Sequence, residues 1–394
     1  MRKGWEYKKL GEVTSFFRGL TYSGKDEVDY SNNVVLRSNN IDLSTNSLNF
    51  DELKFISDSI TIPQDKKLRK NSIFMCMSNG SKQHLGKVAF IEKEYPYAFG
   101  GFMGLIVPNE DRLVPKFTYY YFCSQKFKAY LSAIGNGANI NNIKYIDIAK
   151  DSIPLPPQST QLAIVSELDK INELIRLKKE QLKDFGNLAQ SLFYEMFGDP
   201  VENEKGWEVK KLKDISREIG DGLHGTPEYS EVDTGCYFIN GNNLENGTIV
   251  IKENTKMVSE KTKAKHYIEM DDFTILVSIN GTLGKVAFYN GENVILGKSA
   301  CYIKLEAYND KKYIFELLKS DYFKRYAESE CTGTTIRNVS LKSMRNFRCP
   351  LPPLPLQRLF AQRIEQIERE KSEVQKSIQD LETLLASRMQ YWFE

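Results

Sequence analysis

Gly86-Lys87-Val88-Ala89-Phe90 decides the fold of this chain, because the same five residues return unchanged as Gly284-Lys285-Val286-Ala287-Phe288. Other short matches accompany them in the same order: Gly4-Trp5-Glu6 with Gly206-Trp207-Glu208, Lys8-Lys9-Leu10 with Lys210-Lys211-Leu212, Asn79-Gly80 with Asn280-Gly281, Ser124-x-x-Phe127 with Ser320-x-x-Phe323, and Pro154-Leu155-Pro156-Pro157 with Pro350-Leu351-Pro352-Pro353. So many matches in one order indicate that the sequence is an internal duplication.

The spacing of the matches divides each copy into two parts. The offset falls from 202 residues between Gly4 and Gly206 to 196 between Ser124 and Ser320, and then stays constant. Length changes are tolerated in surface loops and rarely inside packed elements. The front of each copy is therefore predicted to be globular with variable loops, and the back to be a rigid element.

The rigid part has the apolar pattern of a coiled-coil helix. Apolar residues alternate in steps of three and four, interrupted by Lys178 in the first copy and by Lys371 and Arg388 in the second. The predicted seam consists of Ile164, Leu168, Ile171, Ile175, Leu182, Phe185, Ala189 and Leu192 in the first copy, and of Phe360, Ile364, Ile367, Val374, Ile378, Leu381, Leu385 and Trp392 in the second.

Each seam corresponds to a helix roughly 50 Å long at 1.5 Å per residue. A single helix with one apolar face is not stable alone, so we expect the two helices to pack on each other. The alternative is that each packs on its own globular part. The proline run before each helix ends the preceding strand or loop and fixes the direction in which the helix leaves.

The globular halves are predicted to mix helices and strands. Ser72–Met77 and Phe273–Ser278 are β-rich runs, each followed by an Asn-Gly turn. A helix is expected near Phe117–Leu131 and another near Tyr313–Tyr326, with their aromatic residues in the core. The fold class is therefore α+β, with two pseudo-repeated mixed domains and two long helices.

Composition indicates the cellular compartment of the protein but does not identify its binding partner. The net charge is +2, which neither requires nor excludes a nucleic-acid ligand. No Cys-x-x-Cys pair occurs, and scattered cysteines favour a reducing compartment. The N-terminus lacks the apolar core of a signal peptide, and no apolar run approaches the roughly 20 residues of a membrane span. We expect a cytoplasmic protein without a membrane partner.

Signatures of chemistry are missing from both copies. The segment Gly291–Ser299 has one residue too many for a phosphate-binding loop, and no Gly-x-Gly-x-x-Gly follows a strand. His84, His224 and His266 do not recur at matching positions and have no metal-ligand spacing. We therefore expect no catalytic centre, no bound cofactor and no metal. Two alternatives remain: the chain is a DNA-modifying enzyme with an unrecognised site, or it is a coiled-coil scaffold protein.

Over nearly its whole length the chain resembles a specificity subunit of a type I restriction–modification system. The resemblance is carried by Gly-Trp-Glu at the start of each half, by Gly-Lys-Val-Ala-Phe, and by Pro-Leu-Pro-Pro followed by Gln161 or Gln357. Asp221–Pro227 also resembles a loop common at the start of such domains, and Arg18–Tyr22 takes its place in the first half.

The resemblance implies an architecture and a set of partners. Target-recognition domains at residues 1–156 and 200–352 would each read one half of a bipartite site in double-stranded DNA. Spacer helices at 157–199 and 353–394 would pair in an antiparallel coiled coil. Two methyltransferase subunits carrying S-adenosylmethionine would dock around the helices, and restriction subunits would complete the enzyme. The chain itself would be non-catalytic.

The residues that would contact DNA are the least determined by sequence. Base edges are read by Arg, Lys, Asn and Gln, and phosphates are bound by Lys, Arg, hydroxyls and backbone amides. The candidates are Arg18, Arg37, Asn39, Asn79, Ser81, Lys82, Gln83 and Lys87 in the first half, and His224, Thr226, Asn240, Asn242, Asn280, Thr282, Lys285 and Lys298 in the second. The repeated Lys87 and Lys285 suit phosphate better than bases, because shared residues cannot explain different specificities.

Overall fold

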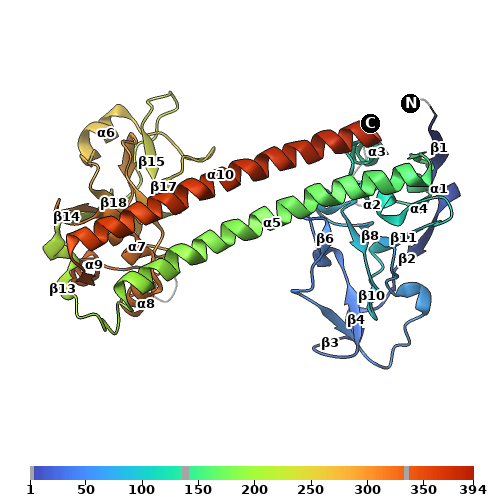
Figure 1. The fold of residues 1–394 in the computed structure, drawn as a ribbon, viewed down its shortest axis with the longest axis horizontal. Coiled ribbons are helices and arrows are strands. Elements are labelled where there is room, and N and C mark those ends of the chain that lie inside the picture. The colour runs from blue at the N-terminus through green and yellow to red at the C-terminus, as the bar shows by residue number, and fades with distance from the viewer. Residues whose placement is uncertain (1–3, 135–141, 332–336) are drawn as a thin grey trace. The chain divides into compact units, whose positions relative to one another are not determined.

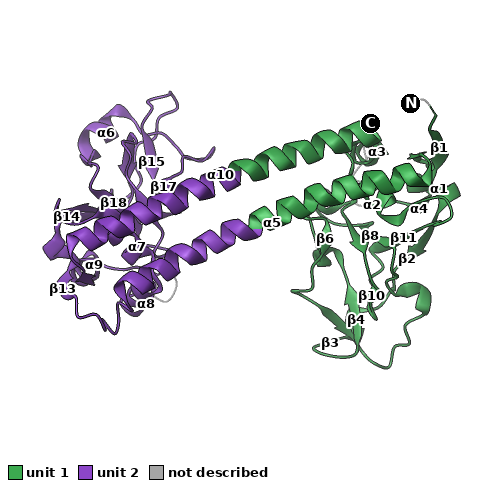
Figure 2. Ribbon diagram, in the orientation of Figure 1, with its two compact units in different colours: residues 1–179, 376–394 green, residues 180–375 purple. Residues whose placement is uncertain are grey.

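The structure is a computed structural model that describes residues 4–134, 142–331 and 337–394. Contacts divide the chain into two units, which Figure 2 shows in different colours: unit 1 contains residues 1–179 and 376–394, and unit 2 contains residues 180–375. Each unit therefore holds one copy of the repeat and one end of each long helix. Among the described residues, no helix combines the length and apolar character needed to cross a membrane.

Unit 1 is built around the four-stranded sheet β2-β11-β8-β9 (Figure 1). Three further sheets lie in this unit, with the orders β10-β4-β7-β3, β1-β12 and β5-β6. The strands of unit 1 are β1 (Glu6–Lys9), β2 (Thr14–Arg18), β3 (Glu27–Val28), β4 (Asn33–Leu36), β5 (Ile41–Asp42), β6 (Ser47–Leu48), β7 (Lys54–Ile56), β8 (Ser72–Cys76), β9 (Val88–Ile91), β10 (Ala98–Phe99), β11 (Met103–Pro108) and β12 (Ser152–Leu155). Its short helices are α1 (Leu10–Val13), α2 (Pro115–Cys123), α3 (Gln125–Ile134) and α4 (Tyr145–Lys150).

Unit 2 repeats this framework around the sheet β14-β21-β18-β19. Its strands, including those of the sheets β15-β20, β13-β22 and β16-β17, are β13 (Glu208–Lys211), β14 (Ser216–Asp221), β15 (Tyr237–Ile239), β16 (Leu244–Glu245), β17 (Thr248–Ile249), β18 (Thr274–Ser278), β19 (Val286–Phe288), β20 (Val294–Leu296), β21 (Ala300–Leu305) and β22 (Arg348–Leu351). Its short helices are α6 (Glu260–His266), α7 (Lys311–Lys319), α8 (Asp321–Ser329) and α9 (Leu341–Asn346).

Strands β8 and β18 are buried on both faces, because alternate side chains enter two different cores. In β8, Ile73 and Met75 pack toward the helices, and Phe74 and Cys76 pack toward the sheet β10-β4-β7-β3. In β18, Ile275 and Val277 likewise pack toward the helices, and Leu276 packs toward the sheets β15-β20 and β16-β17. This explains why these runs are continuously apolar, and it confirms the two predicted strands.

The predicted single helix after each sheet is in fact two helices. α2 and α3 are separated at Ser124, and α7 and α8 at Ser320, where ψ is 155° and 161°. Each serine hydroxyl donates to the carbonyl three residues earlier, Tyr121 at 2.7 Å and Leu317 at 2.6 Å. The repeated Ser-x-x-Phe motif therefore marks a helix break. As predicted, the aromatic residues are core: Phe127 is 0% exposed.

The repeated glutamine after each proline joint anchors the start of a long helix. Gln161 Nε2 donates to Pro156 O at 2.9 Å, and its Oε1 accepts from Val114 N at 2.8 Å. Gln357 makes the equivalent bonds to Pro352 O at 2.8 Å and from Asp310 N at 2.9 Å. Each buried amide thus ties the first helical turn to the loop before α2 or α7.

The long helices are α5 (Gln158–Phe197) and α10 (Leu354–Phe393). In unit 1 the start of α5 packs on the end of α10: Ile164 and Leu168 share a core with Phe393, while Glu167 bonds the guanidinium of Arg388. In unit 2 the end of α5 packs on the start of α10, through Phe193 and Phe360 rings 5.8 Å apart. The helices are therefore antiparallel, as predicted.

Both packing alternatives for the seam hold at once. Every predicted seam residue is buried or partly buried, and the helix ends also pack on the globular parts, as Phe393 does on Phe117 with centroids 5.2 Å apart. The sequence pattern missed Phe193, Phe197 and Phe393, which are at most 3% exposed. A strict heptad excludes them, because they face the globular cores rather than only the other helix.

Candidate nucleic-acid interface

A short 3-10 turn presents the candidate polar residues in both units. It spans Ser38–Asn40 in unit 1 and Gly241–Asn243 in unit 2. The last asparagine of each turn is buried, and its Oδ1 accepts from the backbone of the residue before the turn, at 2.8 Å from Arg37 N and 3.0 Å from Asn240 N. The buried asparagine therefore fixes the backbone, while Arg37 and Asn240 occupy the same position in the two copies.

In unit 1 this turn borders a cavity of about 690 Å³. Four of the predicted DNA-contacting residues line it, namely Arg18, Arg37, Asn39 and Asn79. They come from β2, the 3-10 turn and the loop after β8, so the fold gathers residues that are far apart in sequence. Sequence reasoning missed Tyr22 and Phe102, which also line the cavity. An isolated aromatic in a loop carries no pattern that could have marked it.

The cavity has a positive balance. Neither Arg18 nor Arg37 has a carboxylate partner in the part of the chain that the structure describes. The acidic lining residue Glu27 is paired with Lys54, whose Nζ lies 2.5 Å from its Oε2. Burial raises the pKa of the Tyr22 hydroxyl, which keeps it a neutral hydrogen-bonding group. The unpaired guanidinium groups can therefore bind phosphates or the O6 and N7 atoms of guanine.

The other candidates in the loop after β8 lie outside the cavity. Ser81 and Gln83 are exposed, and Ser81 N donates to Asn79 Oδ1 at 2.9 Å. This bond orients the Asn79 side chain, whose Nδ2 also donates to Ser38 Oγ at 3.0 Å. The side chain of Lys82 lies outside the described residues.

The repeated lysines have a structural role that the sequence did not suggest. Lys87 is 7% exposed, and its Nζ donates to Ile41 O at 2.9 Å, so burial lowers the pKa of its ammonium group. Its counterpart Lys285 approaches Glu245 on β16 at 3.8 Å. Both lysines thus brace the strand after the loop against the β5-β6 or β16-β17 hairpin. Lys87 is not available to a phosphate, so we exclude it from the candidate interface.

Unit 2 brings its candidates together through backbone bonds. Gly297 bridges to Leu223, Ser299 Oγ accepts from Gly241 N at 2.9 Å, and Ile279 N donates to Ser299 O at 3.0 Å. These bonds gather the loops that carry His224, Asn240, Asn242, Asn280, Thr282 and Lys298. Thr226 is exposed beside them. The histidine Nε2 lies 2.8 Å from Asp221 Oδ2.

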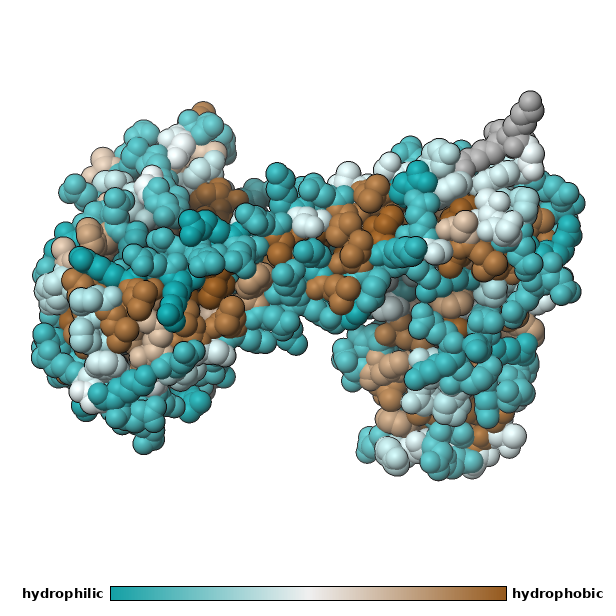
Figure 3. Space-filling view, in the orientation of Figure 1, coloured by the Kyte–Doolittle hydropathy of each residue, from teal (hydrophilic) through white to brown (hydrophobic). Residues whose placement is uncertain are grey.

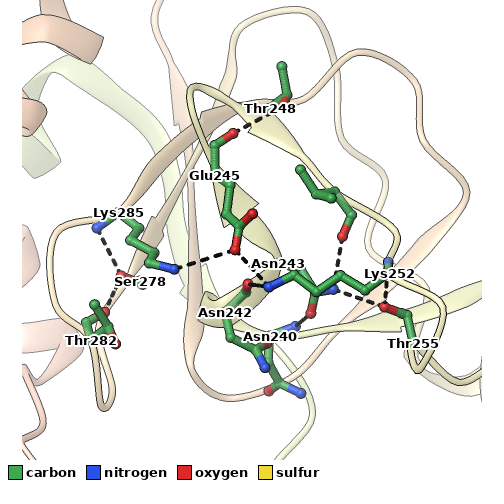
Figure 4. A network of polar contacts seen from close by, with 11 residues as sticks. Asn240, Asn242, Asn243, Glu245, Thr248, Lys252, Thr255, Ser278, Thr282 and Lys285 are labelled. Atoms are coloured by element: carbon green, nitrogen blue, oxygen red, sulfur yellow. Dashed lines mark hydrogen bonds and ion pairs between the residues drawn. The ribbon is translucent and has the colours of Figure 1, made fainter. Parts of the chain in front are cut away.

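The side chains in this region of unit 2 are held by the network drawn in Figure 4. Lys252 Nζ donates to Asn242 O at 2.9 Å and to Glu245 Oε1 at 2.7 Å, and the latter bond lowers the pKa of the carboxylate. Asn243 Nδ2 donates to Thr255 Oγ1 at 3.2 Å. The backbone is pinned, so the exposed amide of Asn242 is presented on a rigid turn.

Backbone hydrogen bonds define which positions of the two copies are equivalent more accurately than sequence matching did. Met77 and Ile279 hold the same place, because their amides donate to Phe102 O and Ser299 O. Asn79 therefore corresponds to Gly281 and not to Asn280, which corrects the sequence match by one residue. It follows that the copies present different side chains at equivalent positions: Arg37 against Asn240, Asn79 against Gly281, and Phe102 against Ser299.

Known proteins resemble this chain over nearly its whole length. It is 24% identical to the type I restriction enzyme StySPI specificity subunit of Salmonella potsdam, over 98% of this chain and 87% of that protein. It is 23% identical to the EcoKI specificity subunit of Escherichia coli K12, over 95% of this chain and 84% of that protein.

Solved structures share the fold. A chain from a study of complex assembly and conformational transition of the type I R-M system superposes with a TM-score of 0.64 at 17% identity, covering 99% of this chain and 97% of that one. The S subunit of a type I restriction–modification system from M. genitalium gives 0.51 at 15% identity, covering 100% and 98%.

A family model accounts for both copies of the repeat. The model for the type I restriction modification DNA specificity domain matches residues 2–184 and again residues 204–383. These two matches include the strands, the 3-10 turns and most of both long helices. The chain therefore belongs to the family of type I restriction–modification specificity subunits.

Proposed function

We propose that this specificity subunit reads an asymmetric bipartite site in double-stranded DNA, one half with each unit. The observation that carries the proposal is the repeated 3-10 turn, on which one framework presents Arg37 in unit 1 and Asn240 in unit 2. An arginine pairs best with guanine and an asparagine with adenine in the major groove. The same scaffold with different readers suits two unlike half-sites.

The proposed unit 1 surface consists of Arg18, Arg37, Asn39 and Asn79 around the cavity. The proposed unit 2 surface consists of His224, Asn240, Asn242, Thr282 and Lys298. The exposed Ser81, Gln83 and Thr226 flank these surfaces, and Asn280 and Lys285 are partly buried beside them. Arg18 and Lys298 would supply phosphate contacts that fix position, and Arg37 and the amides would supply base contacts that select sequence.

We further propose that the long helices dock methyltransferase subunits, which would bind S-adenosylmethionine and modify adenine, and that restriction subunits join them. In unit 1, Leu174, Leu177 and Leu384 are between 45% and 47% exposed on these helices. Figure 3 shows apolar side chains at the surface along the helix pair. Exposed leucines on a helix whose seam is already filled are suited to contacts with another protein. The complex would act in the cytoplasm.

A domain exchange tests whether each unit reads its own half of the DNA site independently. Residues 1–152 are replaced by the same region of a relative, and methylated adenines are mapped across a genome that supplies the methyltransferase subunit. We expect only one half of the methylated site to change. A change in both halves, or in neither, would contradict reading by separate units. Methyl transfer by the purified chain alone would instead support the alternative of an enzyme with its own site.

A further inference from the structure

Phe102 is an apolar side chain held in water by a rigid backbone. Its ring is 73% exposed on the turn between β10 and β11, at the border of the unit 1 cavity. Its carbonyl accepts from Met77 N at 2.9 Å and from Ser78 N at 3.1 Å. Met103 N closes the turn by donating to Gly100 O at 2.8 Å. The backbone is therefore fixed by the sheet, while the ring makes little contact with its own core.

The surroundings of the ring indicate what covers it. Arg18 and Arg37 line the same cavity without a carboxylate partner, and Glu27 is neutralised by Lys54. An apolar partner protein would leave these guanidinium groups buried and unpaired, which is costly. DNA supplies phosphates for the cations and flat base faces for the ring, so it matches both chemical features of the cavity.

The equivalent position in unit 2 shows that the fold does not need an aromatic there. Ser299 takes the place of Phe102, and its hydroxyl is used inside the unit, donating to Asn240 Oδ1 at 2.9 Å while accepting from Gly241 N at 2.9 Å. Removing the ring from unit 1 would thus leave the framework intact. The exposed ring is an addition specific to unit 1.

We propose that Phe102 inserts its ring into the base stack of the half-site that unit 1 reads. The inference rests on the proposed function and deepens it by assigning Phe102 as a specificity-determining residue. Apolar wedges of this kind partly unstack one base step and kink the duplex. Pyrimidine–purine steps unstack most readily, so the step beside Phe102 is expected to be TA, CA or TG. Unit 2 has Ser299 at the equivalent position, so no unstacking is expected at the corresponding step of its half-site.

The test uses the full chain with its methyltransferase partner and a duplex carrying the genome-mapped site. 2-Aminopurine, an adenine analogue whose fluorescence rises when it unstacks, replaces each adenine of both strands of both half-sites in turn. We expect binding of the wild type to raise the fluorescence at one step of the unit 1 half-site. Phe102→Ser should abolish this rise and weaken binding roughly 10-fold, about 1.4 kcal/mol, because the stacking of an aromatic ring on a base is lost.

Two matched variants serve as controls. Phe102→Trp retains a flat ring and should keep the fluorescence rise. Tyr30→Ala removes a ring of unit 1 that is 81% exposed and does not line the cavity, so neither signal nor affinity should change. The melting temperature of Phe102→Ser should equal that of the wild type, because the ring is exposed.

The possible failures can be told apart. If the wild type binds its site with no rise at any position, or if Phe102→Ser keeps both the rise and the affinity, the wedge is overturned while the proposed reading of DNA stands. If Phe102→Ser loses the methyltransferase subunit instead of the signal, Phe102 is a protein contact and the wedge is likewise overturned. If the wild type does not bind the mapped site at all, the proposed function itself is overturned.

Discussion

Lys87 and Lys285 show how one repeated residue can mislead a reading from sequence. A lysine repeated in both halves suggested a phosphate contact, because the sequence gives no information about the burial of a single charged side chain. The structure places the first in the interior, with its Nζ on Ile41 O. Both lysines reach the neighbouring hairpin, Lys87 through the Ile41 carbonyl and Lys285 through the Glu245 carboxylate.

Replacing these lysines separates the two roles. Lys87→Met leaves Ile41 O buried without its donor and should lower the free energy of unfolding by about 1–3 kcal/mol. Lys285→Met should cost less than about 1 kcal/mol, because its side chain is 32% exposed and Glu245 keeps Lys252. Denaturant unfolding measures both. An unchanged stability of Lys87→Met, together with a weaker salt dependence of DNA binding, would restore the phosphate role.

Arg37 is the position where a single substitution should alter base preference. Arg37→Asn places on the unit 1 turn the residue that unit 2 carries at Asn240, and neither side chain is part of a core. We expect a loss of about 1–3 kcal/mol in discrimination at one base pair of the unit 1 half-site. Binding to a library of duplexes varied at each position measures this. Asp26→Asn, outside the cavity lining, is the control; equal effects of both variants would contradict the assignment.

At the scale of elements, short repeated motifs have well-defined structural causes. Ser-x-x-Phe marks a helix break followed by a core phenylalanine, and the glutamine after each proline joint anchors a long helix. Strands β8 and β18 could be predicted from their β-rich runs, and the long helices could be predicted from apolar periodicity. The helix break could not, since Phe117–Leu131 has helical periodicity throughout and only the serine interrupts it.

The buried hydrogen bonds of the glutamine anchors should contribute strongly to the free energy of unfolding. Gln161→Leu keeps the volume but leaves Val114 N and Pro156 O without partners, so we expect a loss of about 3 kcal/mol in the free energy of unfolding. Gln158→Leu, which removes only one exposed bond to Glu110 O, should change it by less than about 0.5 kcal/mol. Similar losses for both variants would show that the anchor contributes nothing special.

The pairing of α5 with α10 in unit 1 should depend on pH through Glu167. Hydrogen bonds from Arg388 and Trp392 lower the pKa of its carboxyl below the usual value for glutamate, so the folded state favours the ionised form. This contribution is present above the unfolded value of about 4.3 and is lost as the pH falls through the folded pKa.

The measurement compares the unfolding free energies of the wild type and Glu167→Gln between pH 7 and pH 3. The gap between them should be widest near neutrality and should close below about pH 4. Glu202→Gln, an exposed residue without an ion pair among the described residues, should show no such trend. A gap that stays constant across this range would contradict the coupling.

At the scale of the whole molecule, the duplication could be predicted from sequence, and the way the candidate side chains are brought together could not. Repeats and periodicity survive substitution, whereas the proposed reading surface brings together Arg18, Arg37 and Asn79, which lie far apart in sequence and meet only after folding. Phe102 carries no sequence signal at all. As a specificity subunit the chain is non-catalytic, in agreement with the absence of catalytic motifs from both copies.

Lengthening both helices should change the spacing of the recognised half-sites and nothing else. One heptad inserted after Lys179 and one after Gln375 keeps the seam in phase and adds about 10 Å, the length of about 3 base pairs. We expect methylation of sites with a different spacer and unchanged half-site sequences. If the preferred spacer length stayed the same after the insertions, the idea that the helices set the distance between the half-sites would be contradicted.

The division of unit 1 between residues 1–179 and 376–394 has a consequence for how the protein is made on the ribosome. Unit 2 is one continuous stretch and can complete its core during translation, whereas the earlier-synthesised unit 1 must wait for Phe393 to reach Phe117 and Tyr121. A nonsense codon or a protease cut near residue 376 would thus cripple the half of the molecule encoded first.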